Sequence, residues 1–311
     1  MREIPAYPPS GDGEHLFLFL EKKGISTPQL AEHLAKALQL RPSEVSYAGL
    51  KDKTAVAQQL FCVPAKVESQ VARLEVPAAK ILWWNRHRNK LRTGHLRGNQ
   101  FRIRIREVEK VSAAKDLFDR LLATGAPNYF GPQRFGVQDA NAERGKKLLQ
   151  GPSGAGRFER KLYLSAYQSM LFNRALSARI ERGAFGIALK GDVMRRCDSG
   201  GLFLCREPEQ EQSRMDRFEV SPAGPIFGPR MFRPEEEVAA QEEKLLRDEG
   251  LTVDDFRAGK GEAEGSRRAY RVCLSGAGIE EQGSDLWVSF ELPKGSYATV
   301  VLREMMGCWP A

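Results

Sequence analysis

The 311-residue chain lacks the residue patterns by which many enzymes hold a metal ion or a nucleotide. Its four histidines have no metal-ligand spacing with its cysteines, and no Cys-x-x-Cys pair occurs. No Walker loop is present, and no Gly-x-Gly-x-x-Gly opens a helix after a strand. The sequence therefore predicts an activity that uses no metal and no cofactor, nucleotide or otherwise.

Long apolar runs are also missing. None approaches the roughly 20 residues needed to cross a bilayer, and residues 1–13 hold prolines and charges where a signal peptide would have an apolar core. The five cysteines, at positions 62, 197, 205, 273 and 308, form an odd and scattered set that fits reduced thiols. We expect a cytoplasmic protein with no membrane contact, acting as a monomer.

Positive charge, in contrast, is abundant, with a formal net charge of +8 that suggests a polyanionic partner. Residues 86–106 contain eight lysines and arginines and no acidic residue, and Trp83, Trp84 and Phe101 flank or enter this basic run. Cations neutralise phosphates and aromatic faces accept bases, so we favour RNA contact over a merely solvated strand face. The expected RNA-backbone contacts are Arg86, Arg88, Lys90, Arg92 and Arg97.

The hydrophobic pattern predicts a mixed α and β fold. Residues 15–22 carry an apolar run typical of a strand buried on both faces. A helix should follow, with Thr27 as N-cap and leucines every fourth residue. Strands are expected near 45–48 and 58–63, on either side of a turn, and residues 101–108 alternate as a half-buried strand does.

Beyond residue 108 the pattern predicts further helices and strands. Residues 112–124 form an amphipathic helix with Leu117, Leu121 and Leu122 inward, and Gly125 ends it. A chain of this length is enough for about two domains, and composition shifts near Gly125. Further helices are expected at 161–182 and 235–249, and strands at 270–274, 286–292 and 298–302.

The turn between the strands at 45–48 and 58–63 contains the most informative residues. Residues 47–56 read Tyr-Ala-Gly-Leu-Lys-Asp-Lys-Thr-Ala-Val, so Asp52 stands between two lysines. Neighbouring cations favour a charged, acceptor-only carboxylate, which suits a nucleophile or an electrostatic anchor. A solvated hairpin tip is the alternative, because turns collect Gly, Asp and Lys in any case.

Four sequence elements together resemble the TruD family of tRNA pseudouridine synthases. Residues 47–56 resemble its Gly-x-Lys-Asp-Lys/Arg signature, and residues 98–101, Gly-Asn-Gln-Phe, resemble its Gly-Asn-x-Phe element. Residues 127–136, Pro-Asn-Tyr-Phe-Gly-Pro-Gln-Arg-Phe-Gly, and residues 293–299, Pro-Lys-Gly-Ser-Tyr-Ala-Thr, match two more. The elements stand in the family's order and span nearly the whole chain.

The resemblance implies an α+β pseudouridine synthase fold, with a largely antiparallel mixed sheet flanked by helices. It implies a discontinuous catalytic domain, residues 1–124 and 272–311, and an inserted α/β domain, residues 125–271. The implied reaction isomerises uridine 13 in the D arm of tRNA to pseudouridine, with Asp52 as the catalytic nucleophile and no cofactor. Substrate contacts fall on Lys51, Asn99, Phe101 and Tyr297.

The chemistry of this isomerisation suits a single carboxylate. The N-glycosidic bond breaks and the same base is rejoined through carbon, so no net oxidation occurs. One carboxylate can act as nucleophile and later help to remove a proton, while a flipped base needs an aromatic platform and a basic surface. Whether Asp52 attacks the sugar or the base stays open at this point.

Other interpretations remain for several of these elements. Residues 127–136 fit a packed loop at a domain junction, with Arg134 as a phosphate contact, and Tyr297 fits a core aromatic. A family member without catalysis could bind RNA or act as a chaperone, against which the presence of Asp52, Lys51 and Asn99 argues. An aspartyl phosphatase would need an Asp-x-Asp motif, which is absent.

One departure from the family concerns the start of the chain. Family members carry an upstream segment with a Pro-Glu-Asp-Phe element, whose Phe reaches the active site. The sequence begins with Met-Arg-Glu-Ile-Pro and holds no such element. We therefore expect an exposed strand edge beside residues 15–22.

Overall fold

The computed structural model describes residues 1–151 and 154–307, so that Cys308 lies outside it. Within this range the chain forms two compact units, each assembled from two stretches of sequence. The first unit comprises Met1–Val111 and Ser275–Gly295, and the second comprises Ser112–Leu274 and the residues from Ser296 onward. The division into a catalytic and an inserted domain stays a prediction, because compactness does not assign activity.

The first unit is built on one eight-stranded sheet in the order β13-β14-β6-β1-β4-β2-β5, with β3 beside β4. Every pair is antiparallel except β1 with β4, so the expected α+β class with a largely antiparallel mixed sheet is confirmed. The elements are β1 (Arg2–Pro5), β2 (His15–Lys22), α1 (Thr27–Ala37), β3 (Ser46–Tyr47), β4 (Ala57–Pro64), α2 (Glu68–Val71), β5 (Ala79–His87), β6 (Leu96–Ile105), β13 (Ser275–Gln282) and β14 (Asp285–Pro293).

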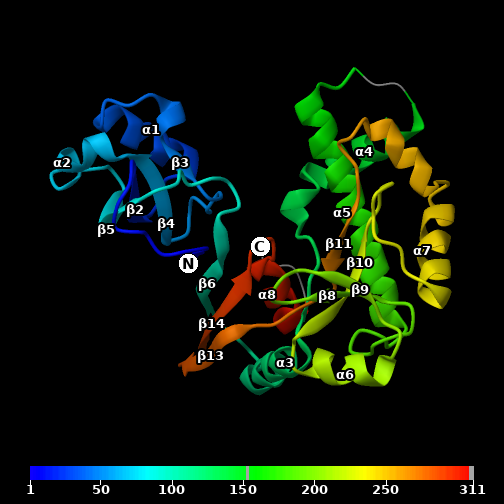
Figure 1. Ribbon diagram of the computed structural model, residues 1–311. Coiled ribbons are helices and arrows are strands. Elements are labelled where there is room, and N and C mark those ends of the chain that lie inside the picture. The colour runs from blue at the N-terminus through cyan, green and yellow to red at the C-terminus, as the bar shows by residue number, and fades with distance from the viewer. Residues whose placement is uncertain (152–153, 308–311) are drawn as a thin grey trace. The chain divides into compact units, whose positions relative to one another are not determined.

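Strand β2 is buried on both faces, as its apolar run predicts. Leu16, Leu18 and Leu20 belong to one buried cluster with the apolar residues of α1, so they lie on the face that this helix covers. Helix α1 and strand β2 are labelled in Figure 1. The alternate side chains, Phe17 and Phe19, belong to a second cluster on the other face. All five are at most 2% exposed, and this two-sided core fixes the register of β2 between its neighbours.

Helix α1 has Ser26, and not the expected Thr27, as its N-cap. Ser26 forms a capping box with Gln29, in which each side chain bonds the other's backbone amide. The Thr27 hydroxyl is thereby released to the interior, where it accepts a hydrogen bond from the backbone amide of Lys51 at 3.0 Å. The first turn of α1 therefore contacts the Asp52 loop.

The expected open edge beside residues 15–22 is wrong. Strand β2 pairs with β4 on one side and with β5 on the other, so its backbone groups have partners along its length. Residues 2–5, for which no strand was expected, form β1 between β4 and β6. In the sheet order, β5 and β13 occupy the ends.

The second unit combines helices with two small sheets, ordered β11-β10-β8-β9 and β12-β7. The 25-residue helix α5 packs against α4 and β10 (Figure 1). The elements are α3 (Val111–Thr124), β7 (Ala126–Pro127), α4 (Ala140–Gln150), α5 (Arg157–Glu181), β8 (Val193–Arg196), β9 (Leu202–Leu204), α6 (Pro208–Asp216), β10 (Val220–Ile226), α7 (Glu236–Asp248), β11 (Ser266–Ala269), β12 (Arg271–Val272) and α8 (Ala298–Met306).

Two expectations for the second unit are wrong in detail. In α3 the buried pair is Phe118 and Leu121, while Leu117 is 38% exposed. The helical period is compatible with burial of either Leu117 or Phe118, and the helix buries the larger side chain, that of Phe118. Residues 298–302, expected as a strand, lie in α8. The adjacent valines of this segment favour a strand locally, but Val300 packs beside Tyr129 and Phe172, and tertiary packing overrides that preference.

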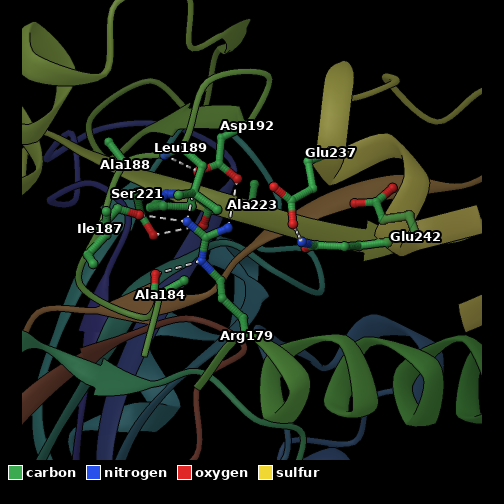
Figure 2. Close-up of polar contacts among 12 residues, drawn as sticks. Arg179, Ala184, Ile187, Ala188, Leu189, Asp192, Ser221, Ala223, Glu237 and Glu242 are labelled. Carbon is green, nitrogen blue, oxygen red and sulfur yellow. Dashed lines mark hydrogen bonds and ion pairs between the residues drawn. The ribbon is translucent and has the colours of Figure 1, made fainter. Parts of the chain in front are cut away.

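Within the second unit, a buried ion pair ties the loop after α5 back to that helix. Arg179 binds both carboxylate oxygens of Asp192 at 2.7 Å and donates to the carbonyls of Ala184 and Ile187 (Figure 2). Both charged residues are 2% exposed. Each charge is thus compensated by hydrogen bonds, as burial of an ion pair requires.

Candidate active site

The loop between β3 and β4 presents Asp52 to solvent. Its Oδ1 accepts hydrogen bonds from the backbone amide and the hydroxyl of Thr54, both at 3.0 Å, in an Asx-turn. Its Oδ2 accepts no hydrogen bond from the part of the chain that the structure describes. One carboxylate oxygen is therefore held within the loop, and the other has no hydrogen-bond partner among the described residues.

Buried side chains hold the backbone of this loop from beneath. Gln59 on β4, which is fully buried, donates from Nε2 to the carbonyl of Gly49 at 2.5 Å. Its Oε1 accepts from the Thr27 hydroxyl at 3.0 Å, and that hydroxyl accepts from the Lys51 amide. The backbone amide of Gly24 donates to the Lys53 carbonyl at 3.0 Å. Buried side chains therefore restrain the backbone of the loop that carries the exposed carboxylate.

Lys22 supplies a further contact to the loop. This last residue of β2 is 1% exposed, and its Nζ lies 2.7 Å from the carbonyl of Asp52, 2.8 Å from that of Ile25 and 3.5 Å from that of Lys51. Burial lowers the pKa of Lys22, and the Asp52 carboxylate acts in the opposite direction. No carboxylate forms an ion pair with Lys22 in the described ranges.

Lys51 turns away from Asp52 into the interior. Its Nζ lies 2.8 Å from Oε2 of Glu3 and donates to Oδ1 of Asn99 at 2.6 Å, and its side chain is 3% exposed. Glu3 on β1 stands directly opposite Asn99 on β6. Burial raises the pKa of Glu3, an effect that the Lys51 ammonium opposes. The expected pair of cations beside the Asp52 carboxylate is therefore not formed by Lys51.

Asn99 and Phe101 occupy the same face of β6, two residues apart. Phe101 packs on Phe290 of β14, with ring centroids 5.6 Å apart, and remains partly exposed. The Gly-Asn-x-Phe element needs a glycine at position 98, because a Cβ there would overlap the carbonyl oxygen of Leu292 on β14. The structure thus brings Lys51, Asn99 and Phe101 to one region of the first unit.

The basic run is partly neutralised by acidic residues from other parts of the first unit. Four of its eight cations form ion pairs: Arg86 with Glu68, Arg88 with Asp12, Arg102 with Glu280, and Arg104 with Asp285. The Lys90 ammonium donates to the Ser43 carbonyl. Arg92 and Arg97 are exposed and have no ion pair with any described residue. Sequence proximity alone overstated how cationic this surface is.

Tyr297 belongs to the second unit, where it is the N-cap residue of α8. Its ring meets that of Phe130 edge-on at 6.3 Å, and a Cβ on Gly131 would press against it. Asn128 from the same element is buried and bonds the backbone of Ala269 and Tyr270. Residues 127–136 therefore pack together with residues 296–299, in keeping with their interpretation as a structural element.

Neither a metal cluster nor a membrane helix is found among the described residues. No group of three His, Cys, Asp or Glu side chains is placed to hold an ion. No helix within residues 1–151 and 154–307 is long and apolar enough to cross a bilayer. Cys62, Cys197, Cys205 and Cys273 are free thiols.

Comparison with known proteins gives this site its context. The family model described as tRNA pseudouridine synthase D (TruD) matches residues 1–155 and 158–305. The chain belongs to the TruD family. It is 45% identical to tRNA pseudouridine synthase D of Anaeromyxobacter dehalogenans strain 2CP-C, over 97% of this chain and 89% of that protein. Identity to a Thermus thermophilus protein of the same name is 41%, over 98% of this chain and 85% of that protein.

The TruD fold is supported by a solved structure as well. A Methanosarcina mazei protein with the provisional name tRNA pseudouridine synthase D superimposes with a TM-score of 0.82, covering 99% of this chain and 91% of that one, at 23% identity. Membership in the TruD family makes the chain a pseudouridine synthase, an isomerase of RNA nucleosides.

The contacts that Glu3, Lys22, Thr27 and Gln59 make with the Asp52 loop were missed at the sequence level. Glu3 and Lys22 meet the Asp52 loop from strands distant in sequence, and Leu50 beside it is 71% exposed. One signal was visible for Lys22, a charged residue that ends an otherwise apolar strand. Glu3 carried no such signal, because its partner Lys51 lies far along the chain.

Proposed function

We propose that this protein converts uridine 13 in the D arm of tRNA to pseudouridine, with Asp52 as the nucleophile. The observation that carries the proposal is the Asp52 carboxylate itself, exposed on a loop whose backbone is fixed by buried side chains. A nucleophile must be accessible and its geometry preorganised, and this loop meets both requirements. The names of the relatives, which specify tRNA, support the substrate class.

Asp52 attacks the ribose or the base after the target uridine leaves its stack. Either attack breaks the N-glycosidic bond, lets the uracil turn, and rejoins C5 of the base to C1′ of the ribose. The C5 proton then moves to solvent, N1 regains a proton, and the carboxylate is released, so atoms and electrons balance without a cofactor. One ionised carboxylate is sufficient for this sequence.

The neighbouring residues have distinct proposed roles. Asn99 and Phe101 meet the uracil edge and face, and Tyr297 stacks on the flipped base. Lys51 is proposed to act by holding the Asn99 amide, since its ammonium is already shared between Glu3 and Asn99. This assigns Lys51 to orientation of a substrate contact rather than to a second cation beside Asp52.

The RNA backbone is proposed to follow the basic run, with Arg86, Arg88, Lys90, Arg92 and Arg97 as contacts. Arg92 and Arg97 are expected to contribute most, because Arg86 and Arg88 must first give up their ion pairs with Glu68 and Asp12. We further propose a monomeric enzyme that acts on tRNA in the cytoplasm.

A modification assay tests the function. An unmodified tRNA transcript with uridine at position 13 is incubated with the protein, and pseudouridine is located by chemical tagging and primer extension. We expect one new pseudouridine, at position 13, with the mass of the tRNA unchanged. A transcript with cytidine at position 13 is the control. Binding without conversion would instead support an RNA-binding protein, and conversion elsewhere would refute the assigned position.

A further inference from the structure

The ammonium of Lys22 contacts the peptide groups on both sides of Asp52. The carbonyl of Lys51 belongs to the peptide unit before the Asp52 Cα, and the carbonyl of Asp52 belongs to the unit after it. Nζ of Lys22 is 3.5 Å from the first oxygen and 2.7 Å from the second. Because each peptide unit is planar, holding both units restrains φ and ψ of Asp52 and thereby the direction of its Cβ.

The third contact of Lys22 anchors this arrangement to the core. Its Nζ donates to the carbonyl of Ile25 at 2.8 Å, in the turn between β2 and α1. Ile25 is itself buried in the cluster that α1 forms on the sheet. One ammonium therefore joins the Asp52 loop to the turn whose Ile25 side chain lies in the hydrophobic core beneath α1.

The lysine stem reaches this position because its strand neighbours are small. Lys22 lies opposite Ala57 on β4 and Ala79 on β5, and it occupies the same face of β2 as Leu20. Its ammonium is enclosed without a carboxylate partner in the described residues, so carbonyl oxygens provide its compensation. An unpaired buried cation is costly, and a methionine of similar length would fill the space without that cost.

From this geometry we propose that Lys22 is a positioning residue, which sets the orientation of the Asp52 carboxylate through the two peptide groups that flank it. Lys22 does not touch the substrate or the carboxylate oxygens. The proposal rests on the proposed function in one respect, namely that Asp52 is the group whose orientation limits the reaction. The restraint on the loop itself is independent of that assignment.

The test compares Lys22→Met with Lys23→Met. Lys23 is the next residue and is exposed, and among the described residues its side chain has no ion pair or hydrogen bond, so its variant is a matched control for loss of a lysine. With the tRNA transcript as substrate we expect kcat of Lys22→Met to fall about a hundredfold, because a displacement near 1 Å at a reacting group has effects of that size. KM and the Kd for tRNA should stay within about twofold.

Hydrogen exchange in the free protein provides a readout that needs no reaction. The amides of Lys51 and Thr54, which bond the Thr27 hydroxyl and the Asp52 carboxylate, should exchange faster in Lys22→Met than in Lys23→Met. If Lys22→Met does not fold, Lys22→Gln, which keeps one amide donor for the Asp52 carbonyl, replaces it and should show a smaller loss of kcat.

Several outcomes would overturn the proposal. A folded Lys22 variant with the kcat of the unaltered protein, a loss confined to KM, or an equal loss in Lys23→Met would each do so. Unchanged exchange of the loop amides would show that Lys22 does not restrain the loop. If the unaltered protein forms no pseudouridine, the proposed function fails, while faster exchange in the Lys22 variant still supports the restraint.

Discussion

The ammonium of Lys51 lies 2.8 Å from the carboxylate of Glu3, with both side chains buried, while the next residue, Asp52, is exposed. Two consecutive residues thus take opposite directions, one into the sheet and one out to solvent. The inward lysine fixes the loop to β1 and to Asn99 on β6. The outward aspartate is left accessible, as the role proposed for it requires.

Asp52→Asn should abolish pseudouridine formation and leave tRNA binding intact. An amide has nearly the shape of the carboxylate but cannot serve as the nucleophile, so we expect a loss of at least about a thousandfold in kcat. Single-turnover tagging assays and filter binding measure the two properties. Asp116→Asn, an exposed change on α3, is the control. Turnover by Asp52→Asn above about a tenth of the original rate would refute the assignment.

Arg92→Gln with Arg97→Gln should weaken tRNA binding more than Arg86→Gln with Arg88→Gln. The first two arginines have no ion pair among the described residues, whereas the second two are paired with Glu68 and Asp12. Each lost phosphate contact lowers the slope of log affinity against log salt by roughly 0.7–0.9. Binding titrations between low and moderate salt measure both slopes. Equal salt slopes for the two double variants, or slopes equal to that of the unaltered protein, would contradict the proposed RNA contacts.

Leu50→Ala should lower activity on folded tRNA. Leu50 is 71% exposed and precedes Lys51, so its apolar side chain is available to occupy the gap that a flipped base leaves. We expect kcat/KM to fall on the order of tenfold, because the variant loses the apolar surface that Leu50 would bury against the opened stack. A short single-stranded oligonucleotide, in which no stack is opened, should show little change. Leu82→Ala, at 39% exposure on β5, is the control. A similar loss on both substrates would contradict the role in base flipping.

The pH dependence of the free energy of unfolding should show the raised pKa of Glu3. Because burial raises its pKa, the folded protein holds this proton more tightly than the unfolded chain does. The protonated Glu3 contributes its full stabilisation of the fold at pH values below its ordinary pKa of 4.5. This stabilisation is lost as the pH rises through the raised pKa of the folded state. The free energy of unfolding of the unaltered protein should therefore fall over this window relative to that of Glu3→Gln. Urea titrations at a series of pH values measure it, with the exposed Glu14→Gln as control; parallel curves would refute the assignment.

Much of the fold could be predicted from local pattern. The limits of β2 follow from its apolar run, and the strands on either side of the Asp52 loop were predicted from the turn that they bracket. Where local preference conflicts with packing, prediction failed, as in α8, whose valines favour a strand. The cap of α1 was misplaced by one residue because Ser26 and Thr27 can both fill that role.

The site was harder to predict than the fold. Asp52, Asn99 and Tyr297 follow from motifs, but the contacts that orient Asp52 come from Lys22, Thr27 and Gln59, which no motif includes. Those residues act through backbone carbonyls and amides, and such contacts leave little trace in residue type. The ion pairs of the basic run are likewise invisible in sequence, because their acids lie far along the chain.

The central place of β1 has a consequence for the order in which the chain can fold during synthesis. Strand β1 (Arg2–Pro5) is made well before its partner β6 (Leu96–Ile105), and β6 pairs with β14 (Asp285–Pro293) only once that strand has been made. Until then β6 has an unpaired edge, a surface on which other chains can add. We therefore expect a chain whose synthesis ends between residues 105 and 285 to aggregate, even though most of its first unit has been translated.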